Sequence, residues 1–167
     1  NITKEVVDYI NEVEKETGKD ISVIAAGGIW DSTDIKKFLS LGASGVQMAT
    51  RFVATNECDA SIEFKKAYVN ANEEDVKIIN SPVGMPGRAI CNSFIKKVEK
   101  EKCKIDKCYN CIKTCNIIDS PYCITKALIN SVKGKTEDGL IFCGSNISRI
   151  KEIVSVKDLM KELVCKL

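Results

Sequence analysis

Residues 21 to 49 read ISVIAAGGIWDSTDIKKFLSLGASGVQMA, and this stretch decides the fold. The apolar run 21–26 ends at two glycines, which fits a strand buried on both faces of a parallel sheet. Asp31, Ser32 and Thr33 can each cap a following helix, which Gly42 ends. Residues 44–49 form a second apolar run. Strand, glycine turn, helix, glycine and strand predict a βαβ unit of an α/β fold, with a right-handed crossover.

The flanking sequence predicts further helices and one extended segment. Apolar side chains recur at helical spacing in residues 4–16, 61–71, 121–134 and 155–163. Residues 76–79 are expected to be extended. Residues 81–88 hold two of the three prolines and two glycines, so we expect a structured loop there rather than a strand or helix.

Composition limits the domain organisation and the partners. The 167 residues, 44% of them hydrophobic, suffice for one core but not for two large domains. A formal charge of +2 favours neither nucleic acid nor membrane as partner. No apolar run approaches the roughly 18 to 20 residues of a membrane span, and no signal pattern is present. The chain does not begin with Met, which favours a fragment or a processed chain.

Cysteine and histidine usage bears on chemistry and compartment. The chain has nine Cys and no His. Lack of His removes the commonest general base. Nine Cys without a secretion signal favour the reducing cytoplasm and thiol or metal chemistry over a disulfide scaffold.

Two glycine-bearing strand ends carry the strongest chemical signal. Gly27 and Gly28 follow the first predicted strand, and Gly45 begins the second segment, 45–52, whose residues 47–50 lie at the strand end. Ligands of parallel α/β sheets bind at the carboxyl ends of strands, and the last two loops of an eight-stranded barrel often bind phosphate. Glycine lets backbone N–H groups approach phosphate oxygens. Taken alone, the glycine pair also fits a plain turn.

In order and spacing, these segments resemble the seventh and eighth strands of the nitronate monooxygenase (2-nitropropane dioxygenase) family and of the related flavin-dependent enoyl-acyl-carrier-protein reductases. The resemblance covers most of residues 1–95 and extends to the Gly-Ser and Ser-Val-Lys-Asp-Leu stretches near residues 144–159. It implies the C-terminal portion of a TIM (β/α)8 barrel, with a Cys-rich, mainly helical C-terminal extension. The residues that it implies for FMN binding are Gly27, Gly28, Gln47, Met48, Ala49 and Thr50. Ala49 departs from the family pattern, which usually has glycine there.

The resemblance also implies an activity. An FMN-dependent enzyme of this family oxidises an alkyl nitronate with oxygen to a carbonyl compound and nitrite. The reductase branch instead uses NAD(P)H to reduce an enoyl thioester. The catalytic histidine of the family has no counterpart here, so no catalytic residue is assigned. We expect the chain to need the missing N-terminal part of the barrel, or an oligomer, to act on a small-molecule substrate.

Two side chains beside the predicted site have alternative roles. Arg51 resembles the family's arginine at this position, and it also fits a structural anchor for the loop at residues 82–88. Trp30 follows the glycine turn directly, where its ring can flank a ligand or pack under the next helix.

Five cysteines crowd into one segment with the spacing C-x4-C-x2-C-x3-C-x7-C. They are Cys103, Cys108, Cys111, Cys115 and Cys123. Thiolates at this spacing can converge on zinc or an iron–sulfur cluster. A redox or disulfide-forming thiol group and unliganded buried cysteines remain alternatives, as does a non-catalytic Cys-rich metal-binding module. We therefore divide the chain into a barrel part at 1–95, a Cys-rich insertion or metal-binding segment at 96–134 and a helical segment at 135–167.

Overall fold

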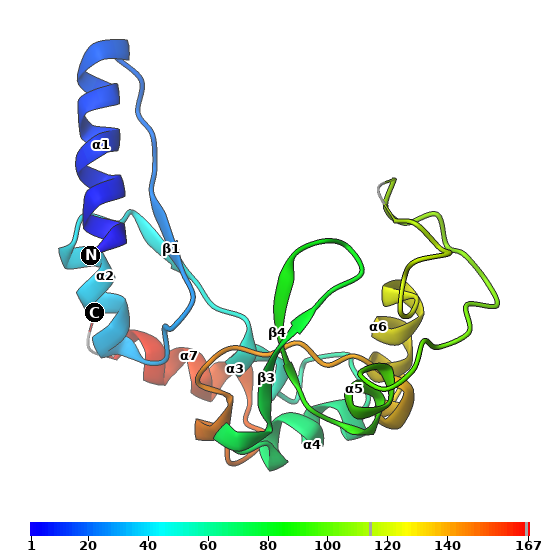
Figure 1. Cartoon of the computed structure of the whole chain (residues 1–167). Helices are drawn as coiled ribbons and strands as arrows, with labels where there is room; N and C mark the ends of the chain where they lie inside the picture. The colour runs from blue at the N-terminus through cyan, green and yellow to red at the C-terminus, as the bar shows by residue number, and fades with distance from the viewer. Residues whose placement is uncertain (114, 166) are drawn as a thin grey trace.

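The computed structural model describes residues 1–113, 115–165 and 167, and its strands form two separate sheets (Figure 1). The strands are β1 (Ile24–Ala26), β2 (Gly45–Gln47), β3 (Val76–Asn80) and β4 (Pro86–Ile90). β1 and β2 are parallel, with Ile24 opposite Gly45, and β3 and β4 are antiparallel. The expected α/β class is confirmed.

The βαβ unit consists of β1, α2 (Ser32–Ser40) and β2, preceded by α1 (Ile2–Thr17). The Asp31 side chain accepts hydrogen bonds from the backbone N–H groups of Thr33 and Asp34, which makes it the N-cap of α2 among the three candidates expected. Gly42 ends this helix with φ 96°, and a Cβ at this position would stand 2.7 Å from Cγ1 of Val7. Its lack of a side chain therefore allows α1 to pack close to the turn before β2.

The predicted burial of the first strand on both faces is wrong. Ala25 is buried, but Ile24 is 55% exposed and Ala26 is also exposed. Within the described residues this sheet has two strands, and its face that carries Ile24 and Ala26 is exposed. A continuous apolar run such as that of β1 is typical of strands that are covered on both faces.

The other helices and 3-10 turns lie C-terminal to the βαβ unit. The α-helices are α3 (Thr50–Val53), α4 (Ile62–Asn70), α5 (Ser93–Val98), α6 (Ile124–Val132) and α7 (Val156–Val164); the 3-10 turns are η1 (Glu73–Asp75), η2 (Thr136–Asp138) and η3 (Ile147–Arg149). The helices expected within 61–71, 121–134 and 155–163 are confirmed, although α6 starts after the expected proline. Ser155 caps α7 by accepting from the Asp158 N–H at 3.0 Å.

The expected loop at residues 81–88 is wrong in part, because its end belongs to β4. Pro86 is the first residue of β4 and stands opposite Asn80. A proline fits the start of an edge strand, where its missing N–H costs no ladder bond. The turn itself is shorter than expected and includes Gly84, with φ 85° and its N–H bonded to the Ser81 carbonyl at 3.0 Å.

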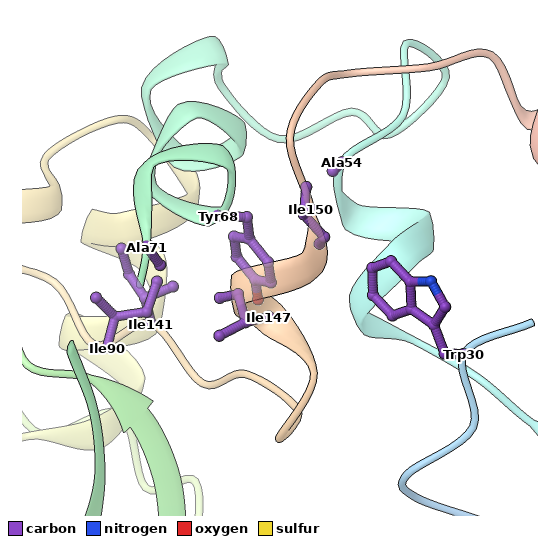
Figure 2. Packing of buried hydrophobic residues seen from close by; sticks show 8 residues of the cluster. All are labelled: Trp30, Ala54, Tyr68, Ala71, Ile90, Ile141, Ile147 and Ile150. Atoms are coloured by element: carbon purple, nitrogen blue, oxygen red, sulfur yellow. The ribbon is translucent and has the colours of Figure 1, made fainter. Parts of the chain in front are cut away.

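Three apolar clusters hold the elements together. The first, shown in Figure 2, contains Trp30, Ala54, Tyr68, Ala71, Ile90, Ile141, Ile147 and Ile150. The second contains Ile79, Ala89, Phe94, Ile95, Tyr122, Ala127 and Leu140. In the third, Leu159 and Leu163 of α7 pack against the βαβ unit through Ala25, Ile29 and Ile35. The C-terminal helix is thus part of the core that supports β1, while the domain boundaries at 95 and 134 stay predictions.

The extension after α5 is less helical than expected. The described residues of the segment 99–123, which leave out 114, form neither α-helix nor strand. The mainly helical character predicted for the extension is therefore wrong for this segment, whose close cysteines and lysines leave little apolar surface to pack a helix. Among the described residues, no helix has the length and the apolar character needed to cross a membrane.

Replacing Ile147 by alanine tests the first cluster. Ile147 is fully buried at 0% exposure, so Ile147→Ala should lower the free energy of unfolding by about 2 to 5 kcal/mol, through lost apolar contact and a residual cavity. The matched control is Ile2→Ala, because Ile2 is 78% exposed. Urea unfolding followed by circular dichroism measures both, and equal losses would contradict the assigned core.

Candidate functional site

A pocket of about 240 Å³ lies at the carboxyl ends of β1 and β2. All six residues expected to bind FMN line it: Gly27, Gly28, Gln47, Met48, Ala49 and Thr50. A third segment, residues 144–146, closes the pocket. The structure thus brings the two predicted segments together around one space, and their role in binding FMN stays a prediction.

The glycine pair is required by backbone conformation. Gly27 and Gly28 have φ angles of 89° and 71°, in the left-handed region that favours glycine. A Cβ at either position would meet no heavy atom within 4 Å. The surrounding space is therefore open, and a side chain at Gly28 would both strain the backbone and occupy the approach to the pocket.

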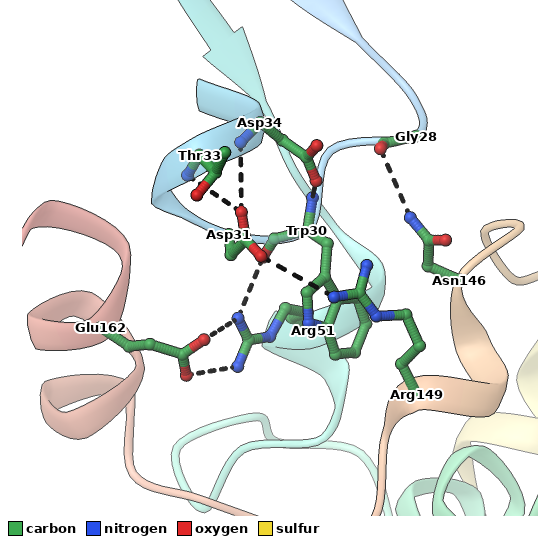
Figure 3. Close-up of polar contacts among 9 residues, drawn as sticks. All are labelled: Gly28, Trp30, Asp31, Thr33, Asp34, Arg51, Asn146, Arg149 and Glu162. Carbon is green, nitrogen blue, oxygen red and sulfur yellow. Dashed lines mark hydrogen bonds and ion pairs between the residues drawn. The ribbon is translucent and has the colours of Figure 1, made fainter. Parts of the chain in front are cut away.

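The segment 144–146 was not among the predicted site residues. The Gly144 N–H donates to Thr50 Oγ1 at 2.9 Å, and a Cβ on Gly144 would stand 2.7 Å from the same oxygen. The Asn146 amide donates to the Gly28 carbonyl at 3.4 Å (Figure 3). The Gly-Ser pair that directly follows the apolar run 140–143 was a sequence signal for a binding loop. Its partners Thr50 and Gly28 lie about a hundred positions away in the sequence, so the sequence alone did not predict the contact.

Trp30 lies beside the pocket and between two guanidinium groups. The Cζ atoms of Arg51 and Arg149 each lie 4.5 Å from the centroid of its ring (Figure 3). Arg51 also donates from Nη1 to the Trp30 carbonyl at 2.9 Å. Trp30 is only 9% exposed and belongs to the first core cluster, and it also lines the pocket. It lies where it can flank a ligand, but it packs in the first cluster rather than under the next helix as considered from the sequence.

Arg51 is a structural anchor, but the expected partner was wrong. Instead of the loop 82–88, it binds Glu162 of α7 with two parallel hydrogen bonds of 2.8 and 2.7 Å. The hydrogen bond from Arg51 holds the pKa of the Glu162 carboxyl below its ordinary value. This bidentate pair ties α3 to the last helix.

Asp31 completes the charged group around the tryptophan. Its carboxylate lies 3.7 Å from Arg149. The backbone N–H of Asp34, and then that of Thr33 and the charge of Arg149, lower the pKa of Asp31. Each of the two arginines that flank Trp30 thus has an acidic partner, Glu162 for Arg51 and Asp31 for Arg149.

The five cysteines of the predicted metal site do not all meet. Cys108, Cys111, Cys115 and Cys123 line one cavity of about 210 Å³, whereas Cys103 lines a different pocket and packs against the second core cluster. Over residues 1–113, 115–165 and 167, no three Cys, Asp or Glu side chains are grouped to hold a metal ion. All nine cysteines are free thiols. A five-cysteine site is therefore a wrong description of this segment.

Similar proteins include two bacterial relatives, each named a probable nitronate monooxygenase. The Staphylococcus saprophyticus protein is 37% identical over 100 residues, which cover 60% of this chain and 26% of the relative. The Bacillus subtilis protein is 29% identical over 147 residues, which cover 86% of this chain and 39% of the relative. The chain thus spans less than half the length of these relatives.

Solved structures show the same fold. FabK from Thermotoga maritima superposes with a TM-score of 0.68 at 27% identity, covering 93% of this chain and 46% of FabK. A nitroalkane oxidase from Streptomyces ansochromogenes gives a TM-score of 0.64 at 21% identity, covering 91% and 41% of the two chains. The second comparison supports the fold alone.

The family assignment rests on almost the whole chain. Residues 2–166 match the family model described as nitronate monooxygenase. This match includes all three segments around the pocket. The chain therefore belongs to the nitronate monooxygenase family.

Proposed function

We propose that this chain supplies the phosphate-binding end of a cytoplasmic, FMN-dependent oxidoreductase that oxidises alkyl nitronates with oxygen. The observation that carries the proposal is the convergence of three segments on one pocket: the glycine pair Gly27–Gly28, the end of β2, and residues 144–146, which begin with a glycine. Family membership supplies the class of reaction.

A few polar groups of the pocket could bind a phosphate. Thr50 and Ser145 offer hydroxyl groups and Asn146 offers an amide, while the glycines allow close approach to the backbone. Arg51 and Arg149 lie nearby, but each already has an acidic partner. Binding would thus depend on backbone and side-chain dipoles more than on an unpaired cation.

FMN would supply the electron-accepting chemistry, and these residues would hold its phosphate end. The chain has no histidine to act as a base. We therefore place the catalytic base and the substrate-binding loops in the rest of the barrel, which this chain does not contain. Nitrite released from an alkyl nitronate by the assembled protein would support this substrate class, and NAD(P)H-dependent reduction of an enoyl thioester instead would overturn it.

Gly28→Val should weaken FMN binding. The substitution places a β-branched side chain at φ 71° beside the pocket, so we expect a loss of at least about tenfold, or roughly 1.4 kcal/mol. Titration calorimetry measures FMN and riboflavin binding to the chain, and to a chimera in which the Bacillus subtilis relative supplies the remaining barrel. Only FMN binding should respond strongly, because riboflavin lacks the phosphate.

Gly84→Val is the matched control for this substitution. Gly84 also has a positive φ, 85°, with no heavy atom within 4 Å of a built Cβ, but it lies in the β3–β4 turn. Gly84→Val should lower the free energy of unfolding without changing the preference for FMN over riboflavin. A chimera that binds both flavins equally, or an equal effect of the two substitutions, would refute the phosphate assignment.

Glu162→Gln should lower the free energy of unfolding by an amount that depends on pH. The folded-state pKa of Glu162 lies below the ordinary 4.5, so its contribution is present above about pH 4.5 and is lost as the pH falls through the folded pKa. Because the side chain is 50% exposed, we expect a loss of only about 0.5 to 1 kcal/mol at neutral pH.

Unfolding by urea at several pH values measures this effect. Glu16→Gln is the control, because Glu16 lies exposed on α1. The difference between Glu162→Gln and the unmodified chain should shrink below pH 4.5. A constant difference across the pH range would mean that the charge of Glu162 does not contribute.

We also propose that the chain needs the rest of a barrel or further copies of itself. Ile2, Tyr9 and Ile24 are 78%, 65% and 55% exposed, and the β1–β2 sheet has open edges. Sedimentation velocity of the isolated chain should show self-association, reduced by Ile24→Lys. A monodisperse monomer with cooperative unfolding would contradict this expectation.

A further inference from the structure

A pocket of about 370 Å³ is lined by residues of α5, of the irregular segment 99–123 and of α6. Four lysines contribute to its wall: Lys97, Lys102, Lys104 and Lys126. We propose that this lysine pocket binds a small organic phosphate, namely a phosphate monoester with an apolar body. It shares no lining residue with the flavin-phosphate pocket, so the proposal does not depend on FMN binding.

The charge of the wall favours a doubly charged anion. Besides the four lysines, two carboxylates line the pocket, those of Glu101 and Asp138. The lysines therefore exceed the carboxylates locally by as much as cations exceed anions in the whole chain, whose formal charge is +2. A phosphate monoester carries about −1.5 to −2 at neutral pH and accepts hydrogen bonds through three oxygens. It matches this excess better than a singly charged carboxylate ligand does.

Several of the lysines have only weak partners. Lys104 and Lys126 share the carboxylate of Asp106, at 3.7 and 3.5 Å. Lys102 donates to the Ile118 carbonyl at 3.5 Å. All three distances are longer than the about 2.8 Å of a strong charge-assisted hydrogen bond, and exposed ion pairs contribute little to stability. A phosphate group can therefore replace these contacts at small cost.

Backbone and core contacts hold the lysines around one space. The Cys103 N–H donates to the Pro121 carbonyl at 2.7 Å, which keeps the two lysines that flank Cys103 beside the start of α6. Cys103 also packs against the second core cluster. Lys97 and Lys126 lie on α5 and α6, and buried side chains of both helices belong to the same cluster. The pocket is thus supported by the core.

Two aromatic side chains form an apolar part of the wall. Phe94 and Tyr122 both line the pocket, and their rings meet edge to face with centroids 5.1 Å apart. Ala127 lies in the same wall. A ligand with a ring or a short alkyl group would cover these side chains, whereas inorganic phosphate would leave them uncovered. The pocket therefore favours an organic phosphate.

The Tyr122 hydroxyl provides a second observation. Tyr122 is 3% exposed, and among the described residues its hydroxyl has no hydrogen-bond partner. Burial raises the pKa of Tyr122 to about 12, so the hydroxyl stays a donor at neutral pH. Buried donors without an acceptor are unfavourable and rare. A phosphate oxygen in the pocket would be an acceptor for it; since the hydroxyl is shielded from solvent, this contact would involve a small shift of the wall.

Titration calorimetry of the 167-residue chain with phenyl phosphate tests the proposal. We expect saturable binding, with inorganic phosphate about tenfold weaker because it lacks the ring, and benzoate severalfold weaker because it carries one charge. Phenyl phosphate binding should persist in Gly28→Val, which alters the other pocket. Equal binding of inorganic phosphate, tighter binding of benzoate, loss of binding in Gly28→Val, or no saturable binding would each overturn the proposal.

Lysine variants test the location of the site. Lys97→Gln and Lys126→Gln should each weaken phenyl phosphate binding severalfold, because each removes a cation from the wall. Lys66→Gln is the matched control, since Lys66 lies exposed on α4. An equal effect of Lys66→Gln would show general attraction to a positive chain and would refute the lysine pocket.

A pair of tyrosine variants tests the hydroxyl. Tyr122→Phe should weaken phenyl phosphate binding severalfold without lowering the free energy of unfolding, because the hydroxyl it removes has no partner to lose. Tyr68→Phe is the matched control. Tyr68 is 4% exposed and donates to the Phe142 carbonyl at 2.6 Å, so this variant should lower stability and leave binding unchanged. Unchanged binding in Tyr122→Phe would refute the assigned contact.

Discussion

The stack of Trp30 between two arginines is the interaction on which the site depends. Trp30 follows Gly28, Arg51 follows Thr50, and Arg149 follows Asn146 at a short distance. Each of the three segments that line the pocket is therefore continued by one member of the stack. Contacts between a planar ring and two planar cations hold the segments at a fixed spacing, so the pocket does not rely on strands of only three residues.

The last helix completes this support from the other side. Leu159 and Leu163 pack under the βαβ unit, and Glu162 between them in sequence reaches Arg51 with both carboxylate oxygens. A helix close to the end of the sequence thus stabilises the first strand and the second predicted phosphate segment at once. Apolar burial supplies most of the favourable free energy, and the ion pair sets the orientation.

Local signals explain which parts of the structure were predictable. The Asp31 cap, the glycine pair and the βαβ order all arise within about thirty residues of sequence, and the segments at residues 27–28 and 47–50 do meet. The contact of residues 144–146 depends on how distant segments pack, which local periodicity does not encode. Pro86 at an edge strand was missed because two prolines and two glycines in one short segment favour a loop unless a partner strand is known.

The cysteine segment and the exposed strand show the same limit in other ways. Spacing alone grouped Cys103 with four other cysteines. In the structure Cys103 packs against the second core cluster and lines a different pocket. The apolar run around Ile24 is typical of a strand that is covered on both faces. Ile24 is nevertheless exposed, because no segment of the described structure packs over it. A local sequence pattern predicts which side chains favour burial, whereas tertiary packing determines whether they are buried.

Trp30 is the only tryptophan of the chain, and this gives the stack a spectroscopic consequence. Its indole lies next to the pocket and between two charged planes. Intrinsic fluorescence of the protein therefore reports on a single, known environment. A ligand that enters the pocket and a disturbance that separates the arginines would change the emission of the same ring, so occupancy and integrity of this region can be followed without an added label.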